Sequence, residues 1–417
     1  MPASKPDHKS GAHWDSANLM NVMKELGVVA PHTNEPMSEA LCFGMMGGIS
    51  GGYQYCPSVP AAADKYPGAK GKWAKCSGIT IIGRALSYAT DASLQNKFCD
   101  RIGAKLAVKE SSGAKAAFAH VAEAVVGGKP AIVFCGRTTL PFSGTAITWG
   151  CHSMYSVVVH SIDEGRKTAL VGDHAATPFE ISLEDLEKTR AQVCSHKNRS
   201  LTIEPPSRWN AAALTKAILD GIRDCVQTNL SPKMKSFSLE SLSEWSKLMV
   251  NSSNQRGWLK VFSAGAIYRP LRDVFDAIET MGTGGGLFRP LYADFLTEAA
   301  RIAKNKKLEA CASTYQDLGK QWTGLADATL PDHLKPFKQT KDLLRKNDEL
   351  YRDKGAPALK TIEQNRKKLL DLQDQVESAF PLNTTQTIDL LQGLVPKVEF
   401  LHKAEILALE QLKAAVS

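Results

Sequence analysis

The fold of this sequence is decided by the stretch Ser156-Val157-Val158-Val159-His160-Ser161. Its three valines are β-branched and uninterrupted, which is typical of a strand buried on both faces. Ala131–Phe134 predicts a strand before this one and Thr168–Val171 a strand after it, with a turn at Asp163–Arg166. A sheet is therefore predicted at the centre of the first zone of the chain, residues 11–205.

Helices are predicted around these strands. Asp15–Gly27 carries apolar side chains three and four positions apart, the spacing of a helix that lies on a core. Asp15 and Ser16 are both acceptable N-terminal caps for this helix. Residues 79–107 and 113–128 are predicted to form two further helices. The first zone is therefore expected to be α+β.

The rest of the chain is predicted to be helical. A proline-rich break at Glu204-Pro205-Pro206 separates the first zone from a second zone, residues 207–330. Residues 331–417 are predicted to be a helical C-terminal extension, polar and rich in lysine and glutamate. The main helices of the second zone are expected at 210–230, 239–250, 270–281 and 287–306.

Three breaks are predicted within the C-terminal extension, at Gly355–Pro357, Pro381 and Pro396, because proline interrupts a helix. Between the first two breaks, Lys360–Ala379 places apolar residues at spacings of three and four. This segment is expected to be a long hairpin or a packing arm.

The composition is that of a globular protein. Of 417 residues, 43% are hydrophobic and 23% are charged. The longest apolar runs are far shorter than a membrane span, so no transmembrane segment is predicted. The formal net charge is +8, and basic residues concentrate from Lys304 onward.

The basic residues are either solvated helix faces or a docking face for acidic protein surfaces or lipid headgroups. Nucleic acid is not expected to bind, because no DNA- or RNA-binding motif accompanies the charge. Nine cysteines are scattered without CxxC pairs, and the N-terminus has no apolar secretion stretch. These features predict an intracellular, reducing compartment. No metal site is predicted, because the cysteines and histidines lack the spacing of a zinc module.

Three motifs follow one another in the first zone. The first is Gly11-Ala12-His13-Trp14, ahead of the first helix. The second is Met37–Gly48, which reads Met-Ser-Glu-Ala-Leu-Cys-Phe-Gly-Met-Met-Gly-Gly, and the third runs from Gly128 to Asp173. Together they resemble the N-terminal domain of the butirosin biosynthesis protein H family. The resemblance implies a papain-like, C39-peptidase-like fold that moves acyl groups from a carrier protein.

A papain-like site needs three groups. A thiolate at a helix N-terminus is the nucleophile, a histidine is the base and then the acid, and a third side chain orients the histidine. The resemblance aligns the nucleophile with Trp14, the histidine with Tyr155 and the orienting acid with Asp173. Two of the three catalytic positions are therefore changed, and a pseudoenzyme is predicted.

A relocated reaction centre is the alternative. Ser16 lies two residues beyond the expected nucleophile, and His152, the first histidine of the family's pair, is the nearest candidate base. Asp15 is a candidate carboxylate nucleophile, although an N-terminal cap is its simpler role. No cysteine of the chain occupies the nucleophile position that the resemblance implies.

The second zone carries one more motif. Residues 279–296 read Glu-Thr-Met-Gly-Thr-Gly-Gly-Gly-Leu-Phe-Arg-Pro-Leu-Tyr-Ala-Asp-Phe-Leu and resemble the signature of the helical domain that follows in this family. Gly284 and Gly285 before a helix could cradle an anion, and Arg289 and Tyr292 could hold a pantetheine phosphate in active relatives. The interpretation that we favour is a tight corner between helices, in which Arg289 neutralises a carboxylate.

The predicted function follows from a retained scaffold without its reaction centre. We expect a non-catalytic structural or interaction subunit of a larger assembly, with other protein subunits as partners and no cofactor. A lineage-specific accessory subunit of a mitochondrial complex such as ATP synthase, on the matrix side, is one such role. Two alternatives stay open: an acyltransferase or amide-forming enzyme with a relocated nucleophile, and a module that binds an acyl or pantetheine group without turnover.

Overall fold

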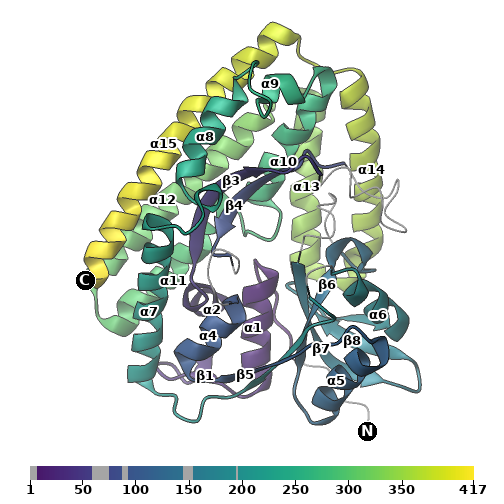
Figure 1. The fold of residues 1–417 in the computed structure, drawn as a ribbon, viewed down its shortest axis with the longest axis vertical. Helices are drawn as coiled ribbons and strands as arrows, with labels where there is room; N and C mark the ends of the chain where they lie inside the picture. The colour runs from purple at the N-terminus through teal and green to yellow at the C-terminus, as the bar shows by residue number, and fades with distance from the viewer. Residues whose placement is uncertain (1–6, 59–74, 87–92, 144–153, 194–195) are drawn as a thin grey trace.

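The computed structural model describes residues 7–58, 75–86, 93–143, 154–193 and 196–417 (Figure 1). Within these residues the largest sheet has six strands, all antiparallel, in the order β5-β10-β6-β7-β8-β9. The three strands predicted from the valine stretch and its neighbours are confirmed as β6, β7 and β8. The bounds are β5 (Lys105–Lys109), β6 (Ala131–Gly136), β7 (Met154–Asp163), β8 (Thr168–Gly172), β9 (Phe179–Ser182) and β10 (Ser200–Glu204).

The strand β7 is buried on both faces, as predicted. All three valines at 157–159 are fully buried. The helix α1 (Trp14–Glu25) lies on one face, and α5 (Ala114–Val126) lies on the other. Asn18 ties α1 to the strand, because its Nδ2 donates to the carbonyl oxygen of Ser156 at 2.9 Å. The helix that carries the first motif is thereby fixed against the centre of the sheet.

The prediction of one helix over residues 79–107 is wrong. The described part of this segment holds β4 (Ile79–Arg84), α4 (Leu94–Ile102) and β5. A β-branched run opens the segment and favours a strand, which pairs antiparallel with β3 (Ile49–Tyr55) in a second, two-stranded sheet. Gly103 ends α4, because its φ of +74° lies in the left-handed region that glycine adopts without strain.

The helices predicted for the second zone are confirmed as α7, α8, α10 and α11. They surround β3 and β4 and form one continuous core with α1 and α2 (Figure 1). A short pair, β1 (Val29–Ala30) and β2 (Glu35–Pro36), precedes α2. The remaining bounds are α2 (Glu39–Met45), α6 (Leu183–Ala191), α7 (Ala211–Leu230), α8 (Glu240–Met249), α9 (Trp258–Val261), α10 (Tyr268–Glu279), α11 (Arg289–Ala303) and α12 (Lys306–Thr329).

The C-terminal extension is packed into the body of the protein. Its helices are α13 (Lys335–Lys354), α14 (Leu359–Ser378) and α15 (Thr384–Val416). In Figure 1, α13 and α14 run side by side, while α15 runs along α8 and α12. Leu391 and Leu412 of α15 are fully buried. The extension is therefore part of the hydrophobic core, which agrees with the packing expected for Lys360–Ala379.

The predicted break at Pro396 is also wrong, because α15 continues through it. A proline inside a helix leaves the carbonyl group four residues earlier without its hydrogen bond. Here that residue is Gln392, which is exposed, as is Pro396 itself, so water can satisfy the carbonyl group. Leu394 and Val398 are buried on either side of the proline and hold the helix against the core.

Two further features concern the described residues. None of their helices is both long and apolar enough to cross a membrane. Their cysteines are all free of disulfide bonds, and Cys151 and Cys194 lie outside the described residues. The free cysteines are Cys42, Cys56, Cys76, Cys99, Cys135, Cys225 and Cys311.

Candidate functional site

The second motif holds the start of α1 in place. Glu39 accepts three hydrogen bonds: from the backbone N–H groups of Ala12 (2.8 Å) and His13 (2.9 Å), and from Oγ of Ser16 (2.8 Å). Ser38 accepts a hydrogen bond from the N–H group of Leu41 and thereby caps α2. The serine and glutamate of this motif therefore start one helix and anchor the first turn of another.

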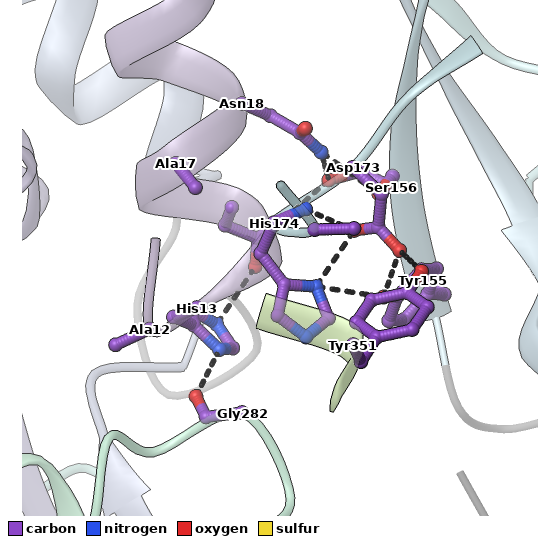
Figure 2. A network of polar contacts seen from close by, with 12 residues as sticks. Ala12, His13, Ala17, Asn18, Tyr155, Ser156, Asp173, His174, Gly282 and Tyr351 are labelled. Atoms are coloured by element: carbon purple, nitrogen blue, oxygen red, sulfur yellow. Dashed lines mark hydrogen bonds and ion pairs between the residues drawn. The ribbon is translucent and has the colours of Figure 1, made fainter. Parts of the chain in front are cut away.

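The glycine-rich loop packs directly beneath that turn. The carbonyl oxygen of Gly282 accepts a hydrogen bond from Nδ1 of His13 at 2.9 Å (Figure 2). A Cβ atom on Gly282 would lie 2.6 Å from the Trp14 ring, and one on Gly284 would lie 2.9 Å from Ala12. Burial, with help from the charge of Arg84, lowers the pKa of His13 to about 4, so this imidazole is neutral at pH 7.

The contacts of the loop favour the tight corner over the anion cradle that we considered. The N–H group of Gly285 donates to Oγ1 of Thr283, and that of Gly286 donates to Oε1 of Glu279. Arg289 is fully buried, and its guanidinium group donates to Oε1 of Glu405 at 2.7 Å and to backbone carbonyl groups. The favoured interpretation, a tight corner with Arg289 neutralising a carboxylate, agrees with this geometry.

Tyr292, the fourth residue of the predicted anion site, is a packing residue. It is fully buried, and its ring lies where a Cβ atom on Gly48 would be. Phe295, from the same motif, fills the space above Gly44 in the same way. The glycines of the second motif therefore receive the aromatic rings of α11, and this close packing joins the first zone to the second.

The structure brings Trp14, Tyr155 and Asp173 together. Trp14 is the first residue of α1, and its ring centroid lies 4.8 Å from that of Tyr155 on β7. The Tyr155 hydroxyl donates to Oδ2 of Asp173 at 2.5 Å. The Tyr351 hydroxyl of α13 donates to the same oxygen at 2.6 Å, and Nδ1 of His174 lies 2.8 Å from Oδ1 (Figure 2). We call Tyr155, Asp173, His174 and Tyr351 the Asp173 cluster.

The Asp173 cluster is buried, and its ionisation follows from its contacts. Burial raises the pKa of Asp173, but the charge of His174 and the hydrogen bonds from the cluster lower it to about 2. Burial and the neighbouring Asp173 carboxylate raise the pKa of Tyr155 well above its usual value. Tyr155 is therefore a protonated hydrogen-bond donor at neutral pH, and it does not take the proton that a base would take.

The alternative nucleophiles have structural partners. Ser16 is fully buried and donates to Glu39. Asp15 forms an ion pair with Nη2 of Arg84 at 3.0 Å and accepts a hydrogen bond from Ser156. Burial raises the pKa of Asp15, but the charge of Arg84 and hydrogen bonds from His13 and Ser156 lower it to about 2. The predicted capping role is wrong, because α1 begins at Trp14 and its N-cap is His13.

His152, the base proposed for a relocated site, lies outside the described residues. Among the described thiols, Cys42 and Cys135 are fully buried, and burial raises the pKa of Cys135 to about 12. No group of histidines, cysteines and carboxylates within the described ranges is arranged to hold a metal ion.

Two protein-family models match the chain. Residues 13–174 match the family model described as butirosin biosynthesis protein H, N-terminal. This part of the chain belongs to the butirosin biosynthesis protein H family. Residues 182–350 match a second model, which is described only as a domain of unknown function (DUF4872). No curated protein matches the chain.

Residues 13–174 therefore form a butirosin-H-like domain. Its match begins at His13, one residue before Trp14, and ends at His174, one residue after Asp173. Tyr351 lies one residue beyond the end of the second match. The residue that completes the Asp173 cluster therefore comes from a part of the chain that neither family model covers.

Sequence reasoning missed two residues of this region. Tyr351 carried no motif, and its partner Asp173 is 178 positions away in the sequence. Arg137, which follows β6, places its guanidinium carbon 5.0 Å from the Trp14 ring centroid and 4.9 Å from that of Tyr155. A single arginine after a strand gives no sequence signal for such a position.

Proposed function

We propose that the chain is a non-catalytic member of its acyltransferase-related family, and that it acts as a structural or interaction subunit of a larger assembly. The observation that carries this proposal is the contact of Trp14 with Tyr155 at the start of α1. An indole ring occupies the place where the resemblance puts the thiolate. A phenol that is bonded to Asp173 occupies the place of the base.

Acyl transfer through a covalent intermediate requires a nucleophile and a base that activates it. Trp14 supplies no nucleophilic atom, and the raised pKa of Tyr155 keeps its hydroxyl protonated. The scaffold around the two positions is kept, since Glu39 still anchors the first turn of α1. These features support loss of the reaction with retention of the fold.

Restoring the two lost groups tests this proposal. In Trp14→Cys/Tyr155→His, the new thiol lies at the start of α1 near an imidazole, and both features lower a thiol pKa. We expect iodoacetamide to alkylate this thiol about tenfold faster at pH 7 than the thiol of Trp14→Cys alone, because one pKa unit changes the thiolate fraction about tenfold. Peptide mapping separates alkylation of the introduced thiol from that of the native cysteines.

The same proteins are then incubated with an acyl thioester and weighed by intact-protein mass spectrometry. We expect no acyl adduct and no thioester turnover with the natural sequence, and an adduct on the double variant. Turnover by the natural sequence that disappears in Ser16→Ala or Asp15→Asn would overturn the proposal in favour of a relocated nucleophile.

The assembly is tested by native size fractionation of the endogenous protein, with mass spectrometry of the proteins that travel with it. We expect the chain in fractions far above its own mass of 45.3 kDa. Subunits of a mitochondrial complex such as ATP synthase among these proteins would give the finer form of the proposal. A native protein that migrates as a free monomer would contradict it.

Two exposed apolar side chains on α15 allow the same experiment to test whether this helix contacts the other subunits. Phe400 and Leu407 are 53% and 70% exposed, and they lie seven residues apart on one helix. We expect Phe400→Ser/Leu407→Ser to shift the chain toward the monomer fractions. Val126→Ser is the matched control, because Val126 is 86% exposed on α5 of the butirosin-H-like domain. An equal shift in both variants would remove α15 as the contact.

A further inference from the structure

Arg137 is a buried cation whose polar groups lack partners among the described residues. Only 7% of its surface is exposed, and its Nε atom is buried without a hydrogen-bond partner. Its guanidinium group forms no ion pair and no hydrogen bond with the described residues. The contacts that it does make are with the faces of the Trp14 and Tyr155 rings, at 5.0 and 4.9 Å.

The other deeply buried arginines donate hydrogen bonds, although Nε of Arg190 is also buried without a partner. Arg190 donates to two backbone carbonyl groups, Arg272 donates to Asp273 and Gln373, and Arg289 donates to Glu405. A buried guanidinium group is stable when its donors and its charge are satisfied. The aromatic ring faces attract the positive charge of Arg137. They do not accept hydrogen bonds from its five N–H groups, which point outward in the plane of the guanidinium group.

The carboxylates around Arg137 do not take its donors. Asp173 is bonded within its own cluster, and Asp348 is paired with Arg352 at 2.9 Å. Asp276 on α10 is buried, and its Oδ2 atom also has no hydrogen-bond partner. Burial raises the pKa of Asp276 to about 6 although the charge of Arg137 opposes this shift. None of the three carboxylates forms an ion pair with Arg137.

A second donor beside Arg137 is also unpartnered. The Nε1 atom of Trp14 is buried without a hydrogen-bond partner, and Trp14 is the ring on which the guanidinium group lies. Trp14 is also the first residue of α1, where the helix dipole favours negative charge. Unsatisfied donors of Arg137 and Trp14 therefore meet at the position where the resemblance places the nucleophile.

We propose that Arg137 and the indole N–H group of Trp14 bind a small oxyanion, a carboxylate or a phosphate, at the place where the resemblance puts the catalytic centre. A guanidinium fork matches both groups, because it can donate two parallel hydrogen bonds to two oxygen atoms. The rings of Trp14 and Tyr155 flank Arg137, and these apolar neighbours suit an anion that carries a short apolar group. This site does not depend on the proposed assembly, since a chain without turnover can still bind a ligand.

Thermal unfolding and titration calorimetry test the site with acetate, butyrate and inorganic phosphate, against chloride at equal ionic strength. A ligand that binds only the folded protein raises Tm as its concentration exceeds Kd. We expect at least one oxyanion to raise Tm where chloride does not. Butyrate above acetate would assign a carboxylate with an apolar group, and phosphate above both would assign a phosphate group.

The variants decide whether Arg137 carries the binding. We expect Arg137→Gln to lose the shift and to weaken the calorimetric affinity at least about tenfold, as removal of a charge-assisted pair does. Arg199→Gln is the matched control and should keep the shift, because Arg199 lies over the Phe134 ring but is paired with Glu110. If Arg137→Gln does not fold, Arg137→Lys keeps the charge without the fork and should weaken the affinity.

Two results would overturn the site. One is that none of the three oxyanions raises Tm or gives heat on titration with the natural sequence. The other is that the affinity is unchanged in Arg137→Gln, or in Arg137→Lys where that variant is used. Neither result bears on the acyl-adduct assay, so failure of this site and failure of the proposed function can be told apart.

Discussion

Replacement of Arg289 by methionine is expected to lower the free energy of unfolding by about 3–5 kcal/mol, because it leaves a buried carboxylate without its partner. Arg289 and Glu405 are both essentially inaccessible to solvent, and their charged atoms lie 2.7 Å apart. The same guanidinium group donates to the carbonyl groups of Ser50 and Gly83. It therefore joins α11, α15 and the two strands β3 and β4.

Denaturant unfolding of Arg289→Met, Glu405→Met and the double variant measures this pair. Removing both charges is expected to cost much less than the sum of the two single changes, because neither charge is then left buried alone. Arg301→Met is the matched control on the same helix. Arg301 is exposed, so its loss should change stability by no more than about 0.5 kcal/mol. Strict additivity of the single changes would contradict a direct pair.

Replacement of Asp173 by alanine is expected to destabilise the protein by about 3 kcal/mol, because it leaves two buried hydroxyl groups without a hydrogen-bond acceptor. Tyr155 and Tyr351 both donate to Oδ2 of Asp173, and His174 contacts Oδ1. Tyr351→Phe removes one donor and leaves the acceptor bonded, so it should cost only about 1 kcal/mol. Equal losses in the two variants would show that the cluster is not centred on Asp173.

The ionisation of Asp173 is expected to make the free energy of unfolding depend on pH. The pKa of Asp173 is about 2 in the folded protein, below its ordinary value of 3.8. Its charged form therefore stabilises the fold fully above pH 4, and this contribution is lost as the pH falls from about 4 to 2. Denaturant unfolding at several pH values should show the natural sequence losing its advantage over Asp173→Asn in that window. A constant difference would exclude the charge as the cause.

Much of the fold could be predicted from local sequence patterns. The valine triplet identified β7 correctly, because burial on both faces requires an unbroken apolar run. The prediction over 79–107 failed because a strand, a helix and a second strand follow one another within a few residues there. At Pro396 the local rule was overridden by tertiary packing, since the buried neighbours Leu394 and Val398 hold the continuous helix α15 against the core.

The candidate site was accessible to sequence reasoning only where motifs reached it. The order of motifs aligned Trp14, Tyr155 and Asp173, and the structure brings the three together. The partners that complete the region are set by tertiary structure alone. Tyr351 comes from 178 positions beyond Asp173, and a sequence pattern cannot pair residues over that distance.

The contact between Asp173 and Tyr351 also sets an order of events during synthesis. The ribosome releases the butirosin-H-like domain before it releases α13 and α15. Until then, the nascent chain holds Asp173 without one of its donors and Arg289 without Glu405, 116 residues ahead. Contacts between such distant residues form slowly and leave apolar surface exposed meanwhile. These contacts therefore form only after α15 has been synthesised, and chaperones that hold nascent chains are expected to bind this protein.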